Sequence, residues 1–131
     1  MKQQVCNDFQ EVVAAHTIRH KSILDILTKT QECTSRVNRA VIKSVTNCGC
    51  VKINAEKKEW PTDITLKELD SYLDSHLLGD LCPECQEVIT EEVGKLLFYV
   101  TALCNTLGLK LNDVIAAEQS KVLALGKFNL T

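Results

Sequence analysis

The sequence predicts an all-α fold, a helical bundle built around two long helices at residues 21–46 and 83–107. Apolar residues recur at steps of three and four in both segments, the pattern of a helix that buries one face. Gly (5) and Pro (2) are rare, and aromatic residues make up only 5% of the chain. Strands and their turns need more of these residues, so the composition favours helices. With 131 residues, 45% of them hydrophobic, we expect residues 1–131 to form a single domain.

The first half of the chain contains two predicted helices. Residues 4–18 carry apolar residues at helical spacing and predict a short amphipathic helix. Residues 21–46 follow with the clearest periodicity in the chain, uninterrupted by Gly or Pro. Asn47 and Gly49 are expected to end this helix, because both tolerate the left-handed conformation found at helix ends.

The middle of the chain is predicted to be irregular. Residues 51–64 contain a short extended piece, VKINA, and a solvated loop. A helix is then expected over residues 66–78, with Thr65 or Thr62 as its cap and Glu68 completing a capping box with Thr65. Gly79 would end it. Its leucines are expected to be buried: Leu66, Leu69, Leu73 and Leu77.

The second half of the chain predicts two more helices. Pro83 suits the first turn of the helix over residues 83–107, where its missing N–H costs nothing, and Gly108 would end that helix. A last helix is expected to start at Asn112, acting as its cap, and to end at Gly126. The tail, residues 127–131, has two apolar residues that could fold back on the domain.

Seven cysteines are a high number for a chain of this length. The start, MKQQVCNDFQ, lacks the basic and apolar regions of a signal peptide, so we expect a cytoplasmic protein with reduced thiols. An odd number of cysteines also does not suit a closed disulfide framework. Paired cysteines in this setting indicate metal ligands or redox groups.

Four of the cysteines form two closely spaced pairs, TNCGC and LCPEC. Cys48 and Cys50 follow the end of one predicted long helix, and Cys82 and Cys85 precede or begin the other. A structural zinc ion takes four ligands in a tetrahedron, and two close pairs supply them from two short turns. The spacing therefore predicts a zinc clip that joins two helix ends.

Other interpretations of the four thiols remain open at this stage. They could hold an iron–sulfur cluster, form a redox or regulatory dithiol, or be unrelated, with two of them buried as small hydrophobic residues. His76 could replace one cysteine as a ligand. A catalytic zinc is disfavoured, because four thiolates leave no open position for water. Cys33 and Cys104 are expected to be buried, since they stand alone on helical patterns.

Acidic residues on the second long helix offer another possible site. Glu84, Glu87 and Glu91 share one face, and carboxylates at this spacing can gather Mg²⁺. The alternative is a solvated face near a helix N-terminus, where the helix dipole favours acids.

The stretch EEVGKLLFYVTALCNTLGLKLNDVIAAEQSKV resembles the second half of a MazG-type nucleoside-triphosphate pyrophosphohydrolase, and QECTSRVNRAVIKSV is similar to the first motif helix of that family. The resemblance implies a helical bundle, usually dimeric or tetrameric, whose acids bind Mg²⁺ and activate water against a nucleotide's phosphate chain. It would assign Glu32, Glu91 and Glu92 as Mg²⁺ ligands, with Lys95 where the family has aspartate. RVNRAV, CGC, LC-x-x-C and LFY-x-x-ALCN also resemble uncharacterised proteins of spore-forming, low-GC bacteria over nearly the full length.

The sequence as a whole favours a non-enzymatic or catalytically degenerate cytoplasmic protein with a structural zinc, acting as a homodimeric regulatory or scaffold module. One alternative is a Mg²⁺-dependent pyrophosphohydrolase that binds a nucleotide, and another is a redox- or zinc-responsive switch. The net charge of −2 gives no reason to expect a nucleic-acid partner. No apolar run approaches the length of a membrane span.

Overall fold

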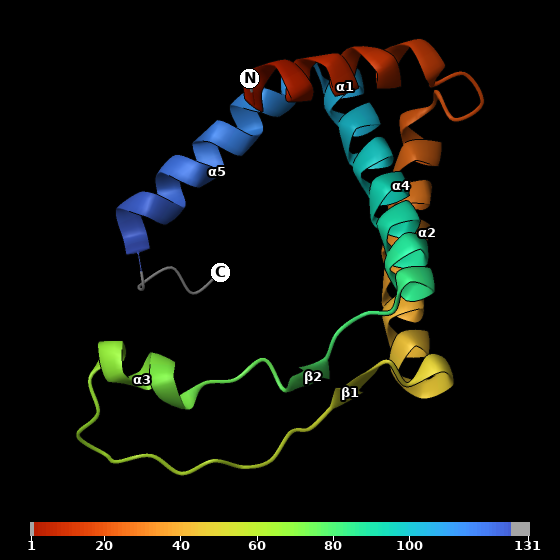
Figure 1. The fold of residues 1–131 in the computed structure, drawn as a ribbon. Helices are drawn as coiled ribbons and strands as arrows, with labels where there is room; N and C mark the ends of the chain where they lie inside the picture. The colour runs from red at the N-terminus through yellow and green to blue at the C-terminus, as the bar shows by residue number, and fades with distance from the viewer. Residues whose placement is uncertain (1, 127–131) are drawn as a thin grey trace.

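The computed structural model describes residues 2–126, and within this range the chain is mostly helical (Figure 1). The prediction of a mainly helical fold is confirmed, and two short strands accompany the helices, the first of them within the extended piece predicted at VKINA. The prediction for the tail, residues 127–131, lies outside the described residues. The elements are α1 (Lys2–His16), α2 (Ile23–Lys43), the π-helix η1 (Ser44–Cys48), β1 (Val51–Ile53), α3 (Leu66–Tyr72), β2 (Leu77–Gly79), α4 (Pro83–Leu107) and α5 (Leu111–Leu125).

Helices α2 and α4, of 21 and 25 residues, lie side by side as an antiparallel pair (Figure 1). The inner face of α2 follows the predicted helical period, with Ile26 and Cys33 buried two turns apart. Ser22 caps this helix, because its hydroxyl accepts a hydrogen bond from the backbone N–H of Leu24 at 3.3 Å. The other described elements connect to the two ends of this pair (Figure 1).

The apolar core lies at one end of this pair, where α1 crosses it. Val13 of α1, Ile26 of α2 and Ala102 of α4 are buried together there. Three partly buried residues pack against them: Phe9, Phe98 and Leu103. This end contains the start of α2 and the end of α4, whereas at the opposite end Ser44 of η1 and Val51 of β1 are the buried residues.

One side chain of α1 fixes the junction between α4 and α5. Gln10 donates from Nε2 to Oδ1 of Asn105 and to the carbonyl oxygen of Leu109, each at 2.8 Å. Its Oε1 accepts from the backbone N–H of Leu111, also at 2.8 Å. The prediction that Asn112 caps α5 is therefore wrong, because Lys110 is the N-cap residue, the helix begins at Leu111, and the distant Gln10 satisfies the N–H of Leu111.

The middle of the chain differs most from the prediction. Thr65 does cap α3, accepting from the N–H of Glu68 at 3.2 Å, but the helix ends at Tyr72 instead of continuing to residue 78. The next residues form β2, which pairs antiparallel with β1 so that Val51 faces Gly79. Gly79 is thus the last residue of a strand and not a helix end. The predicted burial of the leucines is also wrong: α3 has no buried residue, and Leu73 and Leu77 are exposed.

Residues 51–79, from β1 through α3 to β2, form an arm that projects from the end of the α2–α4 pair opposite the apolar core (Figure 1). Helix α5 projects from the core end. In the view of Figure 1 both project to the same side, so the chain has an open, C-like outline. None of the described helices is both long enough and apolar enough to cross a bilayer.

Candidate metal centre

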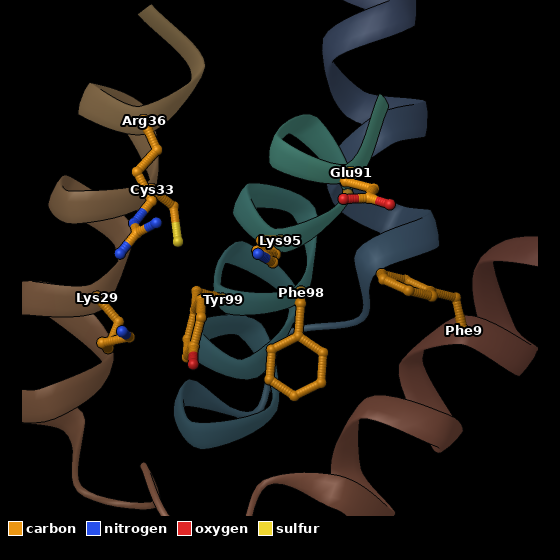
Figure 2. Close-up of a pocket in the computed structure, with 9 residues that line it drawn as sticks. Phe9, Lys29, Cys33, Arg36, Glu91, Lys95, Phe98 and Tyr99 are labelled. Atoms are coloured by element: carbon orange, nitrogen blue, oxygen red, sulfur yellow. The ribbon is translucent and has the colours of Figure 1, made fainter. Parts of the chain in front are cut away.

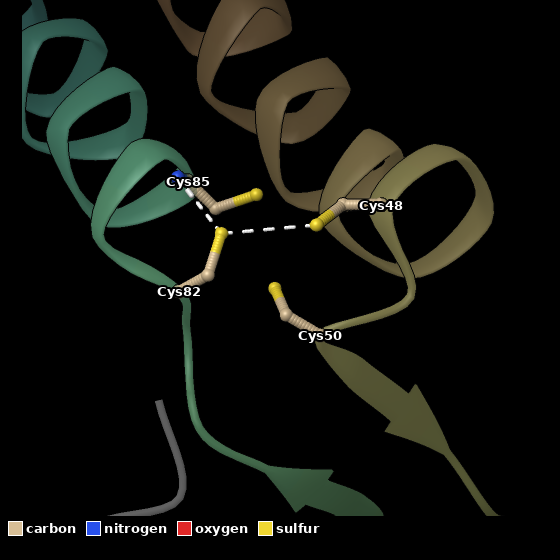
Figure 3. A group of neighbouring side chains, drawn as sticks. All are labelled: Cys48, Cys50, Cys82 and Cys85. Atoms are coloured by element: carbon tan, nitrogen blue, oxygen red, sulfur yellow. Dashed lines mark hydrogen bonds between the residues drawn. The ribbon is translucent and has the colours of Figure 1, made fainter.

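The first pair of thiols is positioned by a change in helix type at the end of α2. Here α2 passes into η1, and the backbone N–H of Gly49 donates to the carbonyl oxygen of Ser44 at 2.9 Å. Gly49 then adopts a left-handed conformation, with φ of 79°, which only glycine adopts without cost. The widened turn and this glycine bring Cys48 and Cys50 to the same side of the chain (Figure 3).

The second pair begins α4. Pro83 occupies the first turn, as predicted, and Cys82 is the N-cap residue. Its Sγ accepts a hydrogen bond from the backbone N–H of Cys85 at 3.4 Å, so a thiol takes the role that serine or aspartate usually has at this position. The cap aims Cys82 and Cys85 toward the end of η1 (Figure 3).

The four sulfur atoms converge at one point. All lie within 4.8 Å of one another, and Sγ of Cys48 is 3.7 Å from Sγ of Cys82. Zn–S bonds of about 2.3 Å in a tetrahedron place the sulfurs about 3.8 Å apart. None of the cysteines forms a disulfide. The prediction that the two pairs come together is confirmed, and their arrangement could hold a metal ion such as zinc.

Hydrogen bonds within the cluster shift the pKa values of its thiols in different directions. The backbone N–H of Cys85 and neighbouring thiols lower the pKa of Cys82 to about 7. The pKa of Cys85 is raised, first because its thiol donates to Cys82 and then by burial. The pKa of Cys48 is raised by the same kind of bond to Cys82. The cluster therefore stabilises a thiolate at Cys82, and a thiolate is the form that binds metal.

The arm approaches the cluster closely at Gly79. This residue has φ of 89°, and a Cβ added to it would lie 2.7 Å from the carbonyl oxygen of Cys50. Since 2.7 Å is shorter than any ordinary Cβ contact, the strand pair could not keep this register with a larger residue. Gly79 thus couples the position of β2 to the backbone of Cys50, a member of the thiol cluster.

Gly79→Ala is expected to lower the free energy of unfolding by at least about 1–2 kcal/mol, because alanine is strained at positive φ and its methyl group displaces the Cys50 carbonyl. Urea denaturation of the two proteins under the same conditions measures this. Gly94→Ala is the matched control: Gly94 lies inside α4 with no neighbour near its added Cβ, so the change should be neutral or stabilising by about 0.5–1 kcal/mol. Equal stability of the two variants would contradict the steric role of Gly79.

The glutamates implied by the resemblance lie along the α2–α4 pair, away from the thiols. Glu32 accepts from Lys29 at 2.9 Å and from Arg36 at 3.2 Å, and these bonds lower the pKa of its carboxyl. Glu92 of α4 pairs with Lys95 at 3.5 Å, while its Oε2 is buried without a hydrogen-bond partner. Within the described residues, the group of potential ligands close enough to share an ion is the thiol cluster. A role for these glutamates in Mg²⁺ binding stays a prediction.

A cavity of about 570 Å³ lies between α1, α2 and α4, next to these glutamates (Figure 2). Lys29 and Arg36 reach it from α2, Glu91 and Lys95 from α4, and Tyr99 stands between them, with the ammonium of Lys29 5.7 Å from the centre of its ring. The cations of this region are shared with Glu32 and Glu92, as described above. The cavity itself is lined by three cations and one anion, because neither Glu32 nor Glu92 is among its lining residues.

The remaining predicted residues have structural positions. Cys33 and Cys104 are buried, as predicted, and burial raises the pKa of the Cys33 thiol. His76 is not part of the thiol cluster; it lies in the turn before β2, and its carbonyl oxygen accepts from the N–H of Asn54 at 2.8 Å. The cluster therefore consists of the four cysteines alone.

Comparison with known proteins gave no match: no family model, no curated protein and no solved structure is significantly similar to the chain. The resemblance to MazG-type pyrophosphohydrolases, and the activity it implies, therefore stay predictions.

Proposed function

We propose that this chain is a helical scaffold module whose four-cysteine site binds one structural Zn²⁺. Cys48, Cys50, Cys82 and Cys85 would be the ligands. One observation carries the proposal: the sulfurs converge at a separation close to that of a zinc tetrathiolate, with 3.7 Å between Cys48 and Cys82. The bound ion would hold the end of α2, the start of α4 and the base of the arm in one place.

The position of the site supports a structural role. The buried apolar cluster lies at the far end of the α2–α4 pair, so the metal would fasten the end that lacks a comparable core. Four thiolates complete a tetrahedron and leave no position for a substrate or a water molecule. Closing the segment between the two cysteine pairs at a metal also constrains the unfolded chain, which stabilises the folded state.

Metal analysis tests this function directly. Protein purified without chelators should contain about one zinc ion per chain, and Co²⁺ exchanged into the site should give the absorption of a tetrahedral thiolate complex. Cys48→Ser/Cys82→Ser should lose both signals. Cys6→Ser is the matched control, since Cys6 is half-buried in α1 and outside the cluster, and it should keep them. Bound iron with visible charge-transfer bands, or metal retained by the double variant, would overturn the proposal.

A second candidate function is a redox-responsive switch, and the exposure of Cys48 favours it. Cys48 is exposed, whereas its three partners in the cluster are partly buried. A peroxide arriving from solvent would meet this sulfur first. Oxidation of Cys48 and Cys82 would form a disulfide, transfer two electrons to the peroxide, which is reduced to water, and remove two ligands from the metal.

If the site is a redox switch, mild peroxide should release zinc, and a thiol reductant followed by added zinc should restore the zinc-bound form. A coloured zinc chelator present at low concentration would follow the release with time. Cys6→Ser should behave like the natural sequence in this assay. Zinc that stays bound, or release that no reductant reverses, would leave the site with a structural role only.

A further inference from the structure

Another cavity lies directly beside the thiol cluster, between the end of α2 and the start of α4. Its volume of about 480 Å³ is within the range of about 300–1,000 Å³ that is usual for sites of small molecules. Two of the four cluster cysteines, Cys48 and Cys85, form part of its wall. Cys48 is exposed, whereas Cys85 is partly buried. Cys48 is therefore the thiol that a molecule in this cavity meets first.

The wall of this cavity also carries one positive and one negative charge, which come from different helices. Lys43 is the last residue of α2, and Glu84 lies in the first turn of α4. Among the described residues, neither of them forms an ion pair, with the other or with a third residue. The larger cavity differs, because its cations are paired with Glu32 and Glu92. Both charges of the smaller cavity are thus available to a ligand.

A small amino acid carries the complementary pair of charges, a carboxylate and an ammonium group on the same carbon atom. Its carboxylate would bind the ammonium group of Lys43, and its own ammonium group would bind the carboxylate of Glu84. Hydrogen bonds between charged groups are stronger than neutral ones and fix the orientation of a ligand. Cys48 adds a sulfur nucleophile to the same wall. A sulfur-containing amino acid in its disulfide form is the ligand that uses all three groups.

We propose that this cavity binds the disulfide of a small amino acid, such as cystine, and that Cys48 undergoes exchange with it. Sγ of Cys48 attacks one sulfur of the bound disulfide, so that a new S–S bond forms to the protein and the S–S bond of the ligand breaks. Sγ of Cys82, which is 3.7 Å from Sγ of Cys48, then attacks Cys48 and displaces the second half of the ligand (Figure 3).

The electrons and protons of this exchange balance without another reactant. Each released cysteine takes the proton of the protein thiol that displaced it. Cys48 and Cys82 are oxidised to a disulfide, and one cystine is reduced to two cysteine molecules. The exchange itself needs no metal, and only its effect on bound zinc, the loss of two ligands, rests on the proposed function.

The first test uses the unsubstituted, reduced full chain as purified, with its zinc content measured in parallel. Cystine should join Cys48 to Cys82, which peptide mass spectrometry identifies after alkylation of the remaining thiols. Excess alanine, which has the same two charged groups and no sulfur, should slow this reaction but not the reaction with the neutral 2-hydroxyethyl disulfide. No effect of alanine, or a disulfide that does not include Cys48, would overturn the proposal. The same selectivity in a chain without zinc would support it while contradicting the zinc site.

Variants of the two charged residues give the second test. Lys43→Gln and Glu84→Gln should each lower the rate with cystine, relative to the rate with 2-hydroxyethyl disulfide, about two- to five-fold, the usual effect of losing one exposed charge pair. Lys52→Gln and Glu87→Gln are the matched controls, because both residues are exposed and lie outside the wall of this cavity. They should leave the ratio of the two rates unchanged. Equal ratios in all four variants would overturn the assignment of the cavity.

Discussion

Removal of the metal from the zinc-loaded protein is expected to open the arm and to leave the end of the molecule around Val13 and Ile26 folded. Structural zinc ions contribute an apparent binding free energy of about 10–16 kcal/mol, and most of that would be lost from one end of the α2–α4 pair. The strands of the arm are only three residues long, too short to persist without the clip. The apolar cluster lies at the other end of the pair and contains no ligand residue.

Hydrogen exchange followed by mass spectrometry measures this difference along the chain. After chelation, the backbone amides of β1 and β2 should exchange faster by at least about a hundred-fold, equivalent to a loss of about 2.7 kcal/mol of local stability. The amide of Gly49, which bonds to Ser44, should lose protection as well. Peptides around Ile26 and Ala102 should change far less. Cys48→Ser/Cys82→Ser should reproduce the pattern without a chelator, and uniform loss of protection would show that the metal supports the whole fold.

Ile26→Ala should have the second large effect, a loss of about 2–5 kcal/mol in the free energy of unfolding. Ile26 is fully buried, and its side chain packs with Val13 and Ala102 in a core that contains few other buried residues. Truncation would remove apolar contacts from all three helices that meet there and leave a cavity between them. Urea denaturation at one protein concentration measures the change, with metal kept at saturation.

Ile18→Ala is the matched control for this variant, because it deletes the same atoms from an exposed side chain. Its cost should stay within about 0.5 kcal/mol. A cost below about 1 kcal/mol for Ile26→Ala would mean that this cluster does not hold the three helices together. Retention of the metal by Ile26→Ala would be consistent with the separation of the two ends of the molecule.

The helices could be predicted from the sequence because their signals are local. Apolar spacing predicts the segments that became α2 and α4, and Pro83, Thr65 and Gly49 mark helix boundaries in the expected way. The extended piece predicted at VKINA contains β1, but β2 and the pairing of the two strands could not be predicted, since the pairing joins residues far apart in the chain and each strand is only three residues long. Leucine spacing at residues 66–77 fits a helix equally well, but none of those leucines is buried by the part of the chain that the structure describes.

The candidate site likewise has features that follow from sequence spacing and features that depend on the folded backbone. Two cysteine pairs at helix ends were enough to predict that the thiols meet, because the ends of neighbouring antiparallel helices lie together. The π-helix at Ser44–Cys48 and the contact of Gly79 with Cys50 depend on backbone geometry that no spacing rule reveals. The pairing of Glu32 with both Lys29 and Arg36 was likewise missed, although the three- and four-residue spacing of these charges on a helix could have indicated it.

The two ends of the α2–α4 pair also differ in how far along the chain their contacts reach, and this bears on the order of folding. Cys48 and Cys82 are 34 residues apart, whereas Gln10 and Asn105, near the apolar end, are 95 residues apart. Contacts between residues close in sequence form faster, since less chain entropy is lost in closing the loop. The thiol end should therefore close first and align the two helices. A metal added before refolding would then speed the formation of the distant apolar contacts as well as stabilise the final fold.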